Sequence, residues 1–104
     1  MARVALDGYG ATSYALALLD KRKGLEQFVV LKAGRGGFRE IVLQKPFAGI
    51  GTVVWRAPPG KSADMYSPGE VRIAHDSIIW ERMESASQQF YYANGRFHKL
   101  QTSD

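Results

Sequence analysis

The chain has 104 residues, a formal net charge of +4 and no cysteine. This length predicts a single domain over residues 1–104 with a modest hydrophobic core. The absence of cysteine excludes disulfides and thiolate metal sites. No apolar run reaches the roughly 20 residues that a membrane-spanning helix requires, so we expect a soluble chain without a membrane span. The natural compartment stays open.

The excess positive charge lies in the N-terminal half of the chain. Residues 1–52 carry eight Lys and Arg against four Asp and Glu, whereas residues 53–104 carry six against six. Much of this charge gathers around two expected turns, and the residues concerned are Lys21, Arg22, Lys23, Arg35 and Arg39. Such residues are typical of solvated turns, and they are also the residues that contact phosphates in nucleic-acid-binding domains.

Residues 13–23 fit two local structures. Residues 13–20 alternate larger and smaller side chains, which favours a strand. The same segment is rich in Ala and Leu and fits a short helix that Thr12 or Ser13 would cap and Gly24 would end. We favour the strand.

Residues 25–43 predict a hairpin. Residues 28–31 form a continuous apolar run, which is typical of a central strand. Residues 34–37 are mostly glycine and predict a flexible, basic connection, after which residues 38–43 return as the second strand. Pro46 is expected to end this pattern, because proline donates no hydrogen bond to a strand ladder.

The middle of the chain predicts short strands around a long loop. Residues 52–56 resume a strand pattern that Pro58 and Pro59 end. Residues 57–69 hold three of the four prolines and several Gly and Ser, so we expect a long surface loop. Residues 70–74 and 77–82 predict two further strands, with a tight turn between them.

The C-terminal segment gives the strongest structural signal. Two aromatic-rich runs meet at Asn94-Gly95, the pair that best tolerates the positive φ angles of a two-residue type I′ turn. In that register Tyr92 lies opposite Phe97, and Tyr91 lies opposite His98 on the other face. We therefore predict a mainly β fold: a single-domain antiparallel meander or small sandwich of seven to eight strands, with little or no helix.

The candidate binding residues come from the aromatic strands. If Tyr92 and Phe97 pack inward, Tyr91 and His98 face outward beside Arg96 and offer a contact surface. We add Trp55 to this set. We expect no catalytic residues, no metal site and no cofactor, because no nucleophile or phosphate-binding motif appears and the two histidines lack a third ligand at a diagnostic spacing. The enzyme alternative would require a convergence of Asp64, His75 and Asp76 in a pocket.

Residues 4–18 resemble the start of FG-GAP or VCBS-type repeats, which open with a calcium loop followed by an apolar strand. The residues that match the loop are Asp7, Gly8 and Gly10. Ala5, Tyr9 and Ser13 stand where the family has carboxylates, so the resemblance implies a degenerate calcium loop. Residues 77–104 look like the end of uncharacterised bacterial envelope-associated or secreted proteins that begin with such a loop.

These observations predict a non-catalytic β domain that serves as a binding or protein-interaction module, in a bacterial protein as the resemblance implies. The expected partner is a protein or a glycan. The alternative is a nucleic-acid-binding β domain that uses the basic N-terminal turns and exposed tyrosines. Exposed strand edges also offer a route to oligomers.

Overall fold

A computed structural model describes residues 1–7, 11–20, 22–48, 52–82 and 86–103, with residues 45–48 as backbone only. Within these residues the protein is all β, with no helix of the length and apolarity needed to cross a membrane. The strands are β1 (Ala2–Val4), β2 (Ser13–Asp20), β3 (Leu25–Gly34), β4 (Gly37–Ala48), β5 (Thr52–Ala57), β6 (Gly60–Ser62), β7 (Val71–Ile73), β8 (Ser77–Arg82), β9 (Ser87–Ala93) and β10 (Arg96–Ser103).

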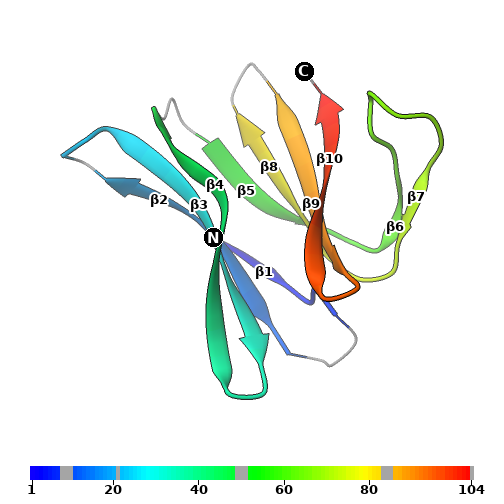
Figure 1. Ribbon diagram of the computed structural model, residues 1–104, viewed down its shortest axis with the longest axis horizontal. Coiled ribbons are helices and arrows are strands. Elements are labelled where there is room, and N and C mark those ends of the chain that lie inside the picture. The colour runs from blue at the N-terminus through cyan, green and yellow to red at the C-terminus, as the bar shows by residue number, and fades with distance from the viewer. Residues whose placement is uncertain (8–10, 21, 49–51, 83–85, 104) are drawn as a thin grey trace.

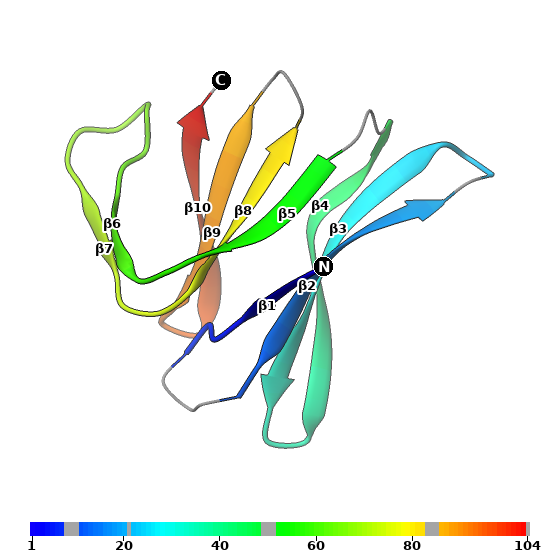
Figure 2. The ribbon, with the colours of Figure 1, turned by 180° about the vertical axis from the view of Figure 1, so that it is seen from behind.

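The strands form two four-stranded antiparallel sheets and one two-stranded ribbon. The first sheet has the order β1-β2-β3-β4, the second has the order β10-β9-β8-β5, and β6 pairs with β7. In Figure 1 the strand β5 lies between β4 and β8, and the β6–β7 ribbon lies beyond β10; Figure 2 gives the same arrangement from behind. The predicted mainly β, antiparallel architecture is confirmed. The described residues form ten strands rather than the expected seven to eight, because Ala2–Val4 and Gly60–Ser62 also pair with neighbouring strands.

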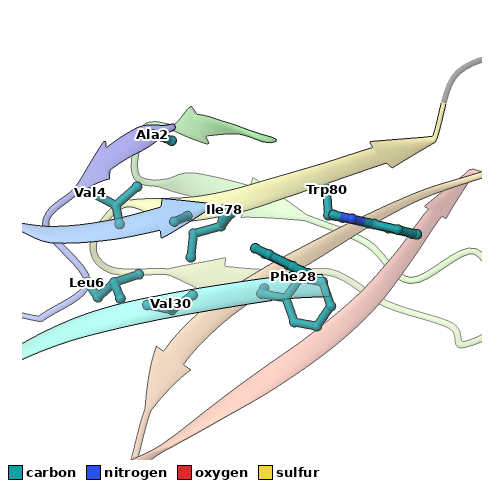
Figure 3. Close-up of a cluster of buried hydrophobic side chains, with 9 residues drawn as sticks. Ala2, Val4, Leu6, Phe28, Val30, Ile78 and Trp80 are labelled. Atoms are coloured by element: carbon teal, nitrogen blue, oxygen red, sulfur yellow. The ribbon is translucent and has the colours of Figure 1, made fainter. Parts of the chain in front are cut away.

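The core lies between the inner faces of the two sheets. Phe28 of β3 is fully buried and stacks on Trp80 of β8, with ring centroids 6.4 Å apart and planes 13° from parallel. It also meets Phe90 of β9 edge to face at 5.3 Å. Val30 and Ile78 fill the space beside these rings, as Figure 3 shows. Aromatic contacts in these two geometries stabilise the packing of one sheet on the other.

Three details of the first sheet differ from the sequence prediction. Ala2–Val4 is a strand, because Arg3 pairs with Tyr14 at the edge of the sheet. The glycine-rich connection is a tight two-residue turn, since Gly34 pairs directly with Gly37. The strand β4 continues through Pro46 to Ala48, because it is an edge strand with one neighbour and two register shifts absorb the irregularity. Residues 13–20 form a strand, as their alternating side-chain pattern predicted.

The predicted long loop at residues 57–69 is wrong in part. Gly60–Ser62 pairs with Val71–Ile73, so β5–β6 and β7–β8 form one long hairpin that bends near Pro58 and Pro59. The outer half of this hairpin packs on the outer face of the second sheet. There the Ser62 hydroxyl donates to Oε1 of Gln89, and Nε2 of Gln89 donates to the Ser77 hydroxyl at 2.7 Å.

The C-terminal hairpin has the predicted turn and register. Asn94 and Gly95 have φ angles of 54° and 79°. Tyr92 pairs with Phe97, and Tyr91 pairs with His98. Phe90 is buried, and Tyr92 and Phe97 pack against the core. Tyr91 and His98 therefore lie on the outer face of the second sheet.

Candidate functional site

A groove of about 1000 Å³ lies at one end of the two sheets, where three segments of the chain meet. Its walls come from residues 32–35 at the β3–β4 turn, residues 72–76 before β8, and residues 91–95 at the β9–β10 turn, together with Asp7 and Ala11. Two hydrogen bonds between Ala5 and Asp76, one of them to the Asp76 side chain, connect the segments that follow β1 and precede β8. The Ala5 amide donates to Oδ2 of Asp76 at 2.9 Å, and the Asp76 amide donates to the Ala5 carbonyl at 3.0 Å.

Lys32 forms the floor of the groove beside the core. Its side chain is 10% exposed, and its ammonium lies 2.8 Å from Oδ2 of Asp7. The ammonium also donates to the Ala33 carbonyl at 3.3 Å and lies 4.3 Å from the centre of the Tyr92 ring. A buried cation requires such partners, because desolvation of an unpaired charge is costly. Lys32 therefore serves as an anchor that holds Asp7 and Tyr92 in place.

The groove carries more available positive than negative charge. The carboxylate of Asp7 binds Lys32, and that of Asp76 accepts from the Ala5 amide and lies 3.4 Å from Nη1 of Arg56. Arg35 and Arg72 are exposed, and neither forms an ion pair with a residue that the structure describes. Two guanidinium groups that line the groove are thus left for an incoming anion. Planar guanidinium groups bind carboxylates and phosphates through paired hydrogen bonds.

The aromatic rings of the groove are already engaged on at least one face. Tyr91 stacks on His98 with centroids 5.0 Å apart and planes 15° from parallel. Nε2 of His98 lies 3.0 Å from the Ala93 carbonyl, which accepts its hydrogen bond and fixes the ring under Tyr91. Tyr92 meets Phe97 edge to face at 5.2 Å and receives Lys32 over its ring. These contacts hold the tyrosines rigid, and they leave fewer ring faces on which a ligand could stack.

The structure brings together only part of the predicted binding set. Tyr91 lines the groove, and His98 supports it from β10. Arg96 is exposed at the start of β10, directly after the β9–β10 turn. Trp55 is 53% exposed on the edge strand β5, where it pairs with Ile79. Neither Arg96 nor Trp55 lines the groove.

The basic residues of the alternative nucleic-acid surface are divided between two ends of the first sheet. Arg22 and Lys23 lie at the β2–β3 turn, whereas Arg35 lies at the β3–β4 turn and Arg39 follows it on β4, opposite Lys32. The ten-residue strand β3 separates these turns by about 30 Å, and Figure 1 shows them at opposite ends of the sheet. Lys21 lies outside the described residues, as do Gly8, Tyr9 and Gly10 of the degenerate calcium-type loop.

The residues of the enzyme alternative are also divided. His75 and Asp76 line the groove. Asp64 instead accepts a hydrogen bond from the Tyr66 amide at 2.9 Å, within the turn that follows β6. Among the residues that the structure describes, no three His, Asp or Glu side chains gather in a group that could hold a metal ion.

Sequence reasoning missed several groove residues, notably Lys32, Arg72, Tyr92 and Asn94. The position of Lys32 could have been predicted to be buried and paired, because it directly follows the buried run 28–31 and a cation inside the fold needs a partner. The position of Arg72 depends on the bent hairpin, which no local pattern predicts. Comparisons with protein-family models, with curated proteins and with solved structures found no match.

Proposed function

We propose that the chain is a non-catalytic binding module and that the groove takes a carboxylate-rich segment of a protein partner. The observation that carries this proposal is the pair of exposed arginines, Arg35 and Arg72, which come from two different segments lining a groove whose own carboxylates are already engaged. Each guanidinium offers a planar set of donors that matches a carboxylate. The volume of about 1000 Å³ suits a few residues of an extended peptide.

Two features favour an acidic peptide over a single-stranded nucleic acid. Nucleic-acid-binding β domains stack successive bases on free aromatic faces, whereas His98 and Lys32 each occupy a face of the groove tyrosines. The basic turns that would follow a phosphate backbone lie about 30 Å apart, at the two ends of β3. Within the groove, a nucleic acid would therefore find few free ring faces for stacking, and the two basic turns do not form a continuous track.

Fluorescence anisotropy with a labelled Asp- and Glu-rich octapeptide tests the proposal. The Arg35→Ala/Arg72→Ala variant should bind at least about ten-fold more weakly, which corresponds to about 1.4 kcal/mol. The matched control is Arg22→Ala/Lys23→Ala, which removes the same charge at the opposite end of the first sheet and should change affinity less than about two-fold.

Three outcomes would contradict the proposal. Equal weakening in both double variants would indicate non-specific attraction to net charge. The absence of binding would remove the acidic peptide as the ligand class. Tighter binding of a single-stranded oligonucleotide of equal charge, with the same dependence on Arg35 and Arg72, would favour the nucleic-acid alternative.

A further inference from the structure

The outer face of the first sheet is unusually apolar for a surface exposed to solvent. It carries side chains from β2, β3 and β4 that alternate with the core residues, and its apolar members are Tyr14, Leu16, Leu18, Val29, Leu31, Phe38 and Val42. Leu18, Phe38 and Val42 are 48%, 60% and 45% exposed, whereas Tyr14, Leu16 and Leu31 are half-buried and Val29, at the middle of the face, is buried by its neighbours. Contiguous exposed apolar surface on a sheet marks an interaction surface.

The outer face of the second sheet is partly covered by the same chain. There the β6–β7 ribbon of the same chain packs on the sheet, Ser62 bonds to Gln89, and Leu100 is buried to 6% exposure. Nothing in the described part of the chain covers the outer face of the first sheet in this way. A second molecule packed on this face would bury its apolar side chains.

One row of residues across this face indicates which molecule fits. Cross-strand pairs connect Arg3 of β1 to Tyr14, Tyr14 to Leu31, and Leu31 to Glu40 of β4. A cation thus lies at one end of the row and an anion at the other, with two apolar residues between them. Arg3 and Glu40 are exposed, they lie about 14 Å apart across three strand spacings, and neither forms an ion pair within the described residues.

This row is complementary to itself. A two-fold axis that runs parallel to the strands, between two copies packed face to face, places β1 of each copy over β4 of the other. Arg3 of each copy then lies opposite Glu40 of the second copy, and Tyr14 lies opposite Leu31. Opposite charges at the rim and apolar residues at the centre are the usual composition of a protein interface.

We propose that the outer face of the first sheet is a homodimer interface, in which two copies pack sheet on sheet about this axis. About seven residues along each of β2, β3 and β4, with the three residues of β1, give a face of roughly 380 Å² per copy. Two such faces lie below the roughly 1,200 Å² at which standard specific interfaces begin, so the dimer is expected to be weak and concentration-dependent. Because the axis follows the strands, both copies present their β3–β4 turns at the same end.

Sedimentation equilibrium over a range of protein concentrations tests the proposal. The wild-type mass should rise from 11.6 kDa toward twice that value, and Val42→Glu should shift the association constant at least ten-fold toward the monomer. The matched control is Val53→Glu, which places the same charge on the outer face of the second sheet at a similar exposure of 49% and should leave the dimer intact.

A charge swap identifies the axis. Arg3→Glu and Glu40→Arg should each weaken the dimer, because each creates like charges across the interface, and the double variant Arg3→Glu/Glu40→Arg should restore it. Within one copy the two side chains are too far apart to compensate each other, so rescue requires the contact between copies. A monomer at all concentrations would overturn the proposal, as would a dimer that responds to Val53→Glu and not to Val42→Glu. Failure of the double variant to recover would overturn the two-fold arrangement.

Discussion

Truncation of two valines tests which face of each sheet is the core. Val30 of β3 is fully buried between the sheets, whereas Val53 of β5 lies on the outer face of the second sheet and is 49% exposed. The change to Ala removes the same atoms from a strand at both positions. Strand preference depends mainly on how a side chain packs and how deeply it is buried, so the difference between the two variants reports the environments of an interior and an edge strand position.

The expected difference follows from the two environments. At Val30 the lost methyl groups cost about 1.6 kcal/mol of transfer free energy, and the cavity between Phe28 and Ile78 adds about 1 kcal/mol. Val53 is about half exposed, so its truncation loses about half of the transfer free energy. Water fills the space that the methyl groups leave, so no cavity cost is added and the free energy of unfolding falls by about 0.8 kcal/mol. The free energy of unfolding of Val30→Ala should thus fall about 2 kcal/mol further than that of Val53→Ala.

Urea denaturation followed by tryptophan fluorescence measures both values. Thermal unfolding should give a melting temperature for Val30→Ala that is about 8 to 16 °C below that of Val53→Ala. Equal losses, or a larger loss at Val53, would refute the assignment of inner and outer faces. Such a result would mean that one of these strands is displaced by one residue, because a shift of one position moves every side chain to the opposite face.

Three further predictions concern the turn, the ribbon and the groove floor. Gly95→Ala should lower the free energy of unfolding by about 1 kcal/mol, because φ at this residue is 79°. Gly36→Ala should stay within about 0.5 kcal/mol of wild type, because an added Cβ meets no atom within 4 Å and the residue has no positive φ. Urea denaturation compares the two variants, and equal losses of stability would contradict the turn geometry. Ser62→Ala should speed amide hydrogen exchange in β6 and β7 more than in β3, because it removes the hydrogen bond to Gln89. The control Ser67→Ala should leave exchange in β6 and β7 unchanged. A uniform loss of protection in all strands would show that the β6–β7 ribbon does not open separately from the sheets. A double-mutant cycle of Lys32→Met and Asp7→Asn should give a coupling energy of about 1 to 2 kcal/mol, because their side chains form a partly buried ion pair at 2.8 Å, and additive effects would exclude that pair as a stabilising contact.

The local sequence determined most of the secondary structure. For the C-terminal hairpin, the turn type, the strand register and the face on which each side chain lies were all predictable. Asn94 and Gly95 accept positive φ angles, and the alternation of aromatic residues then fixes each cross-strand pair. The central position of β3 was predictable from its apolar run for a similar reason. Local steric constraints and hydrophobic periodicity act over a few residues, so the sequence of each segment is enough to predict its strand or turn.

Proline was a less reliable guide. Pro46 suggested a break, yet β4 continues past it, because the cost of a missing donor depends on whether a second neighbour strand is present. Pro58 and Pro59 suggested a loop, yet they mark the bend of a long hairpin whose outer half pairs again. Whether a proline ends a strand depends on which distant segments pair beside it, and the sequence around the proline does not show that.

The candidate site was decided almost entirely by tertiary structure. Tyr91 was identifiable from the hairpin register, but the groove also needs Lys32 and Arg35 from the first sheet and Arg72 from the bent ribbon. These residues lie far apart in the sequence, and their positions depend on how the two sheets pack and on where the β5–β8 hairpin bends. Packing between distant segments decides that geometry, because the buried Phe28, Trp80 and Phe90 hold the sheets together through contacts that no single segment makes alone.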